Sequence, residues 1–350
     1  MSEMTCRERV LAAINHQQPD RTPRDILLEP RVAEMLQGYF GVSDLRAALK
    51  NDIVYVHPAP TRLRHDYSAY FTRPGVTWDE WGRGRVWDSE DHYAEYLYPL
   101  ERAETVEEIL AYPFPDLEAA YRYEGLAEKV RGFQEAGLAV IGEVSETTFE
   151  IAWQLRSMDR LFDDMLHQDE KAVVLLDQIT KRNAYAARQL ALAGVDILYT
   201  GDDVAMQSGL MMSPRLWREW LRPRLRQVIN AAREARPDLP VKYHSDGKIN
   251  DLIPDLIEAG VTILNPVQPE CVDHRWVKAT YGDRLAFDGG LGVQSVLPFG
   301  TPEEVRAHVR QVISILGEGG GLVVGPSHVI ERDTPLENIL AMLQAIDEFG

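Results

Sequence analysis

A short apolar or β-branched run followed by an amphipathic helical stretch recurs along most of this chain of 350 residues. Such alternation is typical of βαβ units that build a parallel sheet. The runs that predict strands are, in chain order, Asp25–Leu28, Ile53–Val56, Leu138–Gly142, Ile197–Thr200, Val241–His244, Thr262–Asn265, Leu285–Asp288 and Leu322–Val324. Eight strands with helices between them predict a single α/β domain over residues 1–350, folded as a closed (β/α)₈ TIM-type barrel.

The segment between the second and third predicted strands is longer than the other connections and has a different composition. Residues 62–115 are rich in Trp, Tyr, Gly and Arg, and the run TWDEWGRGRVWD within them predicts a β-hairpin. Long loops in compact domains are usually functional. We therefore interpret residues 62–115 as a lid-like insertion, the alternative being a flap that packs on the lower rim or on a partner subunit.

Composition and charge narrow the classes of partner. The 37 basic and 55 acidic residues give a formal net charge of −18 at pH 7, with no basic stripe along the chain, which argues against binding to nucleic acid or to anionic lipid. Two cysteines cannot form a disulfide framework, and neither a signal peptide nor an apolar membrane span is recognisable. We expect a soluble cytoplasmic protein that acts on a small molecule.

Polar side chains follow the predicted strands, where a parallel barrel has its active site. We expect catalytic roles for His328, His244, Glu150, Asp203 and Asp288. We expect substrate contacts from His57, Glu146, Asp202, Gln207 and Gln268, and from Trp81 of the insertion.

Two histidines at the ends of predicted strands indicate a candidate metal site. His244 and His328 end the fifth and eighth predicted strands, with carboxylates and a thiol on the strands between them. Imidazole, carboxylate and thiolate are the ligands of Zn²⁺, and a catalytic zinc needs three of them and an open position. The predicted ligands are His244, Asp246, His328 and Cys271. In the alternative, each histidine only hydrogen-bonds to a neighbour or to the substrate.

These motifs make the sequence familiar. The chain resembles the uroporphyrinogen decarboxylase superfamily, which includes corrinoid-linked methyltransferases. The resemblance is carried by segments in the family's order, at Phe149–Arg156, Gly201–Pro223, Lys242–Gln268, Phe287–Val305 and Gly319–Met342. It implies a (β/α)₈ barrel with its site at the carboxyl ends of the strands.

The resemblance to the true decarboxylases is incomplete. His328 stands at the place of their active-site histidine, but Arg24 and Arg31 do not form their N-terminal arginine motif. His57 stands near the place of the aspartate that grips the pyrroles. A macrocycle with many carboxylates is hard to bind for an acidic protein without those arginines.

The methyltransferase branch matches better at the ligand positions. That branch holds zinc with a His-x-Cys pair after the fifth strand and a further Cys after the eighth, where this chain has His244-x-Asp246 and His328. Loss of both soft thiolates favours binding an oxygen of an alcohol or methyl ether over activating a thiol.

The leading hypothesis is therefore a methyltransferase or demethylase that moves a methyl group between a small methylated compound and a corrinoid on a partner protein. Zinc would serve as the Lewis acid on the substrate, and Glu150, Asp203 or Asp288 would orient the substrate or donate a proton. The Trp-rich insertion would close over the bound molecule.

Two alternatives stay open. One is decarboxylation of a porphyrinogen or related acid without a cofactor, with His328 as the proton donor. The other is a binding protein without catalysis. The true decarboxylases are dimers, so the resemblance also allows a homodimer.

Overall fold

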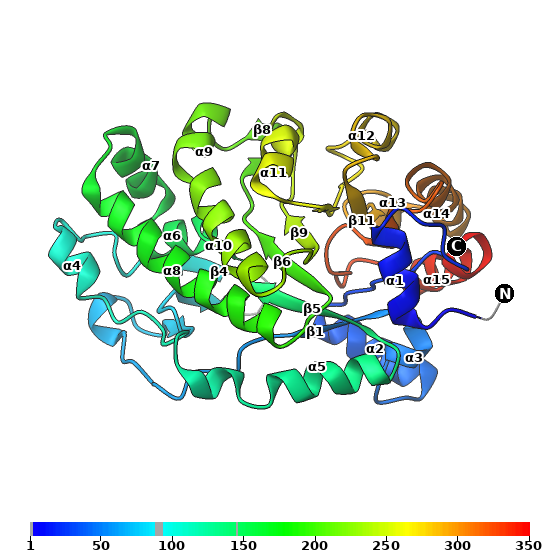
Figure 1. Ribbon diagram of the computed structural model, residues 1–350, viewed down its shortest axis with the longest axis horizontal. Coiled ribbons are helices and arrows are strands. Elements are labelled where there is room, and N and C mark those ends of the chain that lie inside the picture. The colour runs from blue at the N-terminus through cyan, green and yellow to red at the C-terminus, as the bar shows by residue number, and fades with distance from the viewer. Residues whose placement is uncertain (1–2, 88–93, 145) are drawn as a thin grey trace.

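The computed structural model describes residues 3–87, 94–144 and 146–350. Among these residues, seven strands form one curled parallel sheet in the order β1-β5-β6-β9-β10-β11-β12, with helices packed along its outside (Figure 1). The strands are β1 (Ile53–Val56), β5 (Ala139–Val144), β6 (Ile197–Gly201), β9 (Val241–His244), β10 (Ile263–Asn265), β11 (Ala286–Leu291) and β12 (Leu322–Pro326). Seven of the eight strands predicted from the hydrophobic pattern are thus confirmed in the described residues, each within a few residues of its expected bounds.

The predicted strand at Asp25–Leu28 does not form a ladder. Only isolated parallel bridges are found, from Arg24 to Val324 and from Leu28 to Ile330. Between them, the side chain of Asn51 takes both backbone groups of Ile26, accepting from its N–H and donating to its carbonyl at 3.0 Å each. A side-chain amide thus replaces the strand partner that continuous pairing would need.

The helices lie between and around the strands, and α8 and α10 run side by side (Figure 1). In chain order they are α1 (Cys6–Ile14), α2 (Pro30–Phe40), α3 (Arg46–Leu49), α4 (Val106–Leu110), α5 (Leu126–Glu135), α6 (Phe149–Arg156), α7 (Met158–Leu166), α8 (Glu170–Leu192), α9 (Pro214–Trp220), α10 (Arg222–Ala235), α11 (Ile253–Ala259), α12 (His274–Tyr281), α13 (Val296–Phe299), α14 (Pro302–Leu316) and α15 (Leu336–Phe349). Across the described part of the chain, none of these helices combines the length and apolar character that crossing a bilayer requires.

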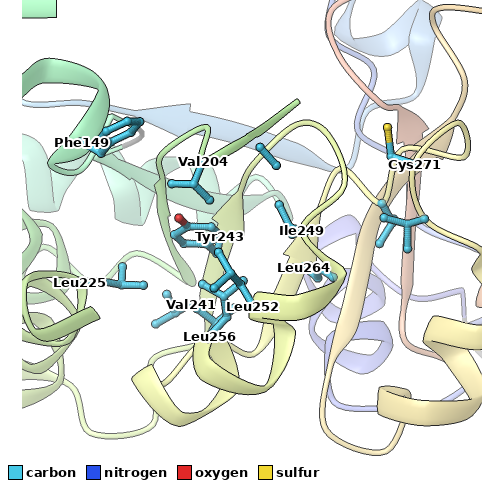
Figure 2. Packing of buried hydrophobic residues seen from close by; sticks show 14 of the residues in the cluster. Phe149, Val204, Leu225, Val241, Tyr243, Ile249, Leu252, Leu256, Leu264 and Cys271 are labelled. Carbon is cyan, nitrogen blue, oxygen red and sulfur yellow. The ribbon is translucent and has the colours of Figure 1, made fainter. Parts of the chain in front are cut away.

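Alternation along each strand divides its side chains between the helices and the concave face of the sheet. Figure 2 shows Val241 and Tyr243 of β9 packed among Leu225, Leu252 and Leu256, whose elements cover the outer face. The other two residues of β9, Lys242 and His244, therefore point to the concave face of the sheet.

The concave face is layered from apolar to polar. Its lower layer is a cluster of small and branched side chains that α1 covers with Val10 and Ile14. Helix α1 is itself set by a capping box in which Thr5 accepts from the N–H of Glu8 and the Glu8 carboxylate accepts from Thr5. Hydrophobic burial therefore closes one end of the curled sheet and leaves polar groups toward the carboxyl ends of its strands.

Above that layer lies a buried ionic cluster. The ammonium of Lys242 is 3.0 Å from Asp288 and 3.9 Å from Asp25, and it lies 4.9 Å from the ring centre of Tyr199. The Tyr55 hydroxyl donates to Oδ2 of Asp25. The pKa of Asp25 is raised to about 6, mainly by burial. The charges of Asp288 and Asp52 act in the same direction as burial, whereas Lys242 and the Tyr55 hydrogen bond oppose it.

The segment between β1 and β5 forms a separate small sheet. Strands β2 (Thr77–Trp78), β3 (Gly84–Trp87) and β4 (Ala94–Leu97) pair antiparallel in that order, and residues 88–93 of the insertion lie outside the described residues. Trp78 stacks on Phe71 with ring centres 6.0 Å apart, and Trp81 is buried. Helical structure resumes at α4 and α5.

The raised pKa of Asp25 makes a prediction about stability. The ordinary pKa is 3.8 and the folded value is about 6, so folding favours the protonated carboxyl. Its stabilising effect is complete below the ordinary pKa and is lost as the pH rises through the folded value. In Asp25→Asn the free energy of unfolding, relative to the wild type, should therefore rise from about pH 4 to about pH 8, by at most about 3 kcal/mol.

Urea denaturation of both proteins across this pH range measures the difference. Asp283→Asn is the matched control, because that side chain is 78% exposed. A difference for Asp25→Asn that is as flat with pH as that of the control would contradict the assignment of Asp25 as the group that titrates.

Candidate functional site

The carboxyl ends of β6 and β9 bring three ligand-type side chains together. Asp203 follows β6, His244 ends β9, and Asp246 follows β9, which pairs with β6 in parallel register. The close approach of the two strands depends on Gly201, since a Cβ at this position would lie 2.6 Å from the carbonyl oxygen of His244.

One ligand atom from each of Asp203, His244 and Asp246 lies within 4.8 Å of the other two. Nε2 of His244 is 3.7 Å from Oδ1 of Asp203 and 3.9 Å from Oδ1 of Asp246. These separations exceed hydrogen-bond length, so the three atoms surround a point rather than bonding to one another. The Asp246 N–H donates to Oδ1 of Asp203 at 2.7 Å and holds the second loop to the first.

Each of these side chains is part-buried, with 20 to 34% exposed. Burial raises the pKa of Asp246, and the negative charge of Asp203 adds to that effect, whereas His244 and His328 act in the opposite direction. Two carboxylates thus share a site with limited solvent, an arrangement that a cation at the central point would stabilise.

Behind His244, a chain of buried polar groups leads into the concave face. Nδ1 of His244 lies 2.6 Å from Oδ1 of Asn265, whose amide nitrogen donates to Oδ1 of Asp288 at 2.6 Å. The same carboxylate oxygen is 3.0 Å from the ammonium of Lys242. Asp288, expected at the open rim, is therefore buried one layer behind it. Lys242 was missed by sequence reasoning, although the alternation of β9 places it on the same face as His244.

Helix α6 begins at the other edge of the group. Asp202 is 6% exposed, and its carboxylate accepts from the N–H groups of Thr148 and Glu150 at 3.0 to 3.1 Å. Thr148 makes no side-chain cap of its own, so Asp202 satisfies the free N–H groups of the first turn. Burial raises the pKa of Asp202 to about 7 despite these hydrogen bonds. The structure therefore gives Asp202 a capping role, and its substrate contact stays a prediction.

Glu150 connects α6 to the metal-type group. Its Oε2 accepts from the N–H of Asp203 at 3.0 Å. Burial, followed by the charges of Asp203, Asp202 and Glu146, raises the pKa of Glu150 to about 9. The raised pKa favours the protonated form of Glu150, which lies in contact with Asp203.

A cavity of about 870 Å³ opens beside Asp246. Its lining includes Gln268, Phe299, Ser327 and the exposed His328. The volume is that of a site for a small molecule. His328 thus shares this cavity with Asp246, but it is not part of the group formed by Asp203, His244 and Asp246.

Cys271 is not part of that group either. Its side chain is buried against apolar neighbours on the loop after β10 (Figure 2), and burial raises the pKa of its thiol. A buried thiol with a raised pKa is a poor ligand because metals bind the thiolate. Asp203, which was predicted as a catalytic residue, completes the group with His244 and Asp246. The sequence had suggested His328 or Cys271 as the further ligands.

The remaining predicted contacts divide between two places. His57, Glu146 and Trp81 line a smaller cavity of about 210 Å³, where Nδ1 of His57 is 3.3 Å from Oε2 of Glu143. Gln207 and Gln268 both donate to Oε1 of Gln294, and their contacts join the loops after β6, β10 and β11.

Arg83 of the insertion is a further residue that sequence reasoning missed. Its guanidinium pairs with Glu146, which follows β5, and donates to Oε1 of Gln154 in α6 at 3.1 Å. The small antiparallel sheet is thereby tied to the rim of the main sheet.

Comparisons with known proteins agree with this architecture. A methyltransferase from Methanosarcina mazei superposes with a TM-score of 0.69 over 99% of both chains, at 20% identity, which shows a shared fold. The methylcobamide:CoM methyltransferase MtaA of Methanosarcina barkeri is 27% identical over 218 residues, which are 62% of this chain and 58% of the relative. The uroporphyrinogen decarboxylase of Chlorobium limicola is 26% identical over 53% of this chain and 51% of its own length.

The chain spans between half and three fifths of the length of these two relatives. The family model for uroporphyrinogen decarboxylase (URO-D) matches residues 92–349. Because this match covers well over half of the chain, the chain belongs to the uroporphyrinogen decarboxylase family.

Proposed function

We propose that this protein is a methyltransferase or demethylase that moves a methyl group between a small methylated compound and a corrinoid carried by a separate protein. The observation that carries the proposal is the group formed by Asp203, His244 and Asp246 at the carboxyl ends of β6 and β9. Relatives named as methylcobamide:CoM and methylated-thiol–coenzyme M methyltransferases support it.

The donor set fits a divalent metal such as zinc. Two carboxylates and one imidazole supply three ligands, and an ion among them would keep an open position. The side chains that would hold it are Asp203, His244 and Asp246. When bound, the metal would polarise the heteroatom that carries the methyl group. The absence of thiolate from this group favours an oxygen heteroatom over sulfur.

The chain's own side chains would do the remaining work. The cavity beside Asp246 would hold the body of the substrate, with Gln268, Ser327 and His328 as its polar contacts. Glu150 would orient the substrate or donate a proton, and the N–H of Asp203 holds its carboxyl group in place by donating to Oε2.

We also propose that residues 23–28 complete the curled sheet to a closed barrel. The N–H of Asp25 donates to the carbonyl of Val324 in β12, and the N–H of Asp52, which precedes β1, donates to the carbonyl of Arg24, both at 3.1 Å. The segment thus bonds to both edges of the seven-stranded sheet. Residues 62–115 would form a lid within this single domain, anchored at the rim by the ion pair of Arg83 with Glu146.

A decarboxylase is the second candidate. It is favoured by the exposure of His328 in the cavity and by the likeness to the Chlorobium limicola enzyme. In that case His328 would donate a proton to the carbon that loses carbon dioxide, without a metal.

The proposed ligand set predicts the metal affinity of substituted proteins. Wild type should bind one Zn²⁺ per chain, and His244→Ala should weaken binding by more than about 100-fold, because outer-shell substitutions alone cost about 10- to 100-fold. Asp203→Asn should weaken it as well. Isothermal titration with Zn²⁺ measures this, and His328→Ala is the control that should retain the wild-type affinity. Equal binding by wild type and His244→Ala would contradict the assignment.

The two candidate reactions predict different responses to a chelator. Methyl transfer to free cob(I)alamin, followed by absorbance with methanol, trimethylamine or dimethyl sulfide as the donor, should proceed in wild type. It should be lost both in EDTA and in His244→Ala. Release of carbon dioxide from uroporphyrinogen at an undiminished rate in EDTA would instead establish the decarboxylase.

A further inference from the structure

The polar chain behind His244 determines more than the position of the ring. It runs from Nδ1 of His244 to Oδ1 of Asn265, from the Asn265 amide nitrogen to Asp288, and from Asp288 to the ammonium of Lys242. Asn265, Asp288 and Lys242 are 7%, 5% and 2% exposed. Water therefore has little access to these groups and cannot readily substitute for one of the hydrogen bonds in the chain.

The Asn265 amide has only one orientation that satisfies its neighbours. Its nitrogen donates to Oδ1 of Asp288 at 2.6 Å and to the backbone carbonyl of Asp288 at 3.1 Å, which uses both of its hydrogens. The reversed amide would turn its oxygen toward those two acceptors. Because Oδ1 of Asn265 must face His244, the ring nitrogen Nδ1 has to be the donor.

The fixed donor decides where the second ring nitrogen keeps its lone pair. A neutral imidazole carries one N–H, so a proton on Nδ1 leaves Nε2 bare. Nε2 is the atom that faces Oδ1 of Asp203 and of Asp246. Those two carboxylates by themselves would attract a proton to Nε2, and the buried chain acts against that preference.

We propose that Asn265, Asp288 and Lys242 are positioning residues that hold His244 as the Nδ1–H tautomer, with the Nε2 lone pair aimed between Asp203 and Asp246. Lys242 acts through Asp288. Its ammonium lies beside Oδ1 of Asp288, the oxygen that accepts from the Asn265 amide, and so fixes the orientation of that carboxylate. The ligand role of His244 rests on the proposed function, whereas the tautomer is a property of the metal-free protein.

The tautomer can be measured directly. The full chain is labelled with ¹⁵N-histidine, stripped of metal with EDTA and studied at about pH 8, where an ordinary imidazole is neutral. Two-bond ¹H–¹⁵N correlation spectra separate protonated from bare ring nitrogens, and His244→Gln assigns the signal. The expected result is a protonated Nδ1 and a bare Nε2. A protonated Nε2 would overturn the proposal, and this measurement needs no substitution in the chain of positioning residues.

Substitution tests whether the tautomer matters for binding. Asn265→Leu removes the acceptor for Nδ1 and should shift the proton to Nε2 and weaken Zn²⁺ binding by about 10- to 100-fold. The matched control is Asn338→Leu, since Asn338 is also buried and donates to the backbone carbonyls of Leu297 in α13 and of Gly300 just after it. It should leave the His244 spectrum and the Zn²⁺ affinity unchanged.

If Asn265→Leu binds Zn²⁺ as tightly as wild type, the positioning role is wrong. If wild type binds no Zn²⁺ while showing the Nδ1–H tautomer, the proposed metal site fails and the tautomer assignment stands.

Discussion

The ammonium of Lys242 lies on the concave face of the sheet, 2% exposed, between the carboxylates of Asp288 and Asp25. Taking a charge out of water costs several kcal/mol in real proteins, and only close partners with good geometry offset it. Here the offset comes from Asp288 at 3.0 Å, from the Tyr55 hydroxyl at 3.3 Å and from the face of the Tyr199 ring. The orientation of Asp288, and through it of Asn265 and His244, follows from this ion pair.

The rim carries more carboxylates than a solvent-poor site tolerates without specific partners. Each is stabilised in a different way: Asp202 caps α6, Asp203 accepts from the backbone of Asp246, and Glu150 has a pKa high enough to keep its proton. The residues that stabilise the local fold are thus also the residues of the candidate site. A change to the cap of α6 would move Glu150, and a change to the loop after β9 would move Asp203.

Family membership and ligand chemistry act at different levels in this protein. The fold that this chain shares with the Methanosarcina mazei methyltransferase brings the carboxyl ends of parallel strands to one edge of the sheet. The donor atoms of this particular chain account for the chemistry that we propose, because two carboxylates and one imidazole form a harder ligand set than one with thiolates. The cavity of about 870 Å³ beside Asp246 would hold the small substrate that we propose.

The sequence by itself determined the strands, because the alternation of apolar and polar residues is local and is read within a few positions. It also located His244, Asp246 and Asp203 at strand ends, since parallel strands present their carboxyl ends to one edge. The local pattern could not show that the run at Asp25–Leu28 lacks a continuous strand ladder. There the side chain of Asn51, 25 positions along the chain, hydrogen-bonds to the backbone N–H and carbonyl of Ile26.

Only the tertiary structure decided which strand-end residues meet. His328 opens on the cavity and Cys271 turns into the core, whereas Asp203 closes on His244, because the sheet's curl and the loop hydrogen bonds set these distances. In the sequence, Lys242 is a single charged residue within a short strand. The fold places its ammonium in β9 3.0 Å from the carboxylate of Asp288 in β11. Local pattern specifies the face on which a side chain lies, and packing over long sequence separations specifies its neighbour.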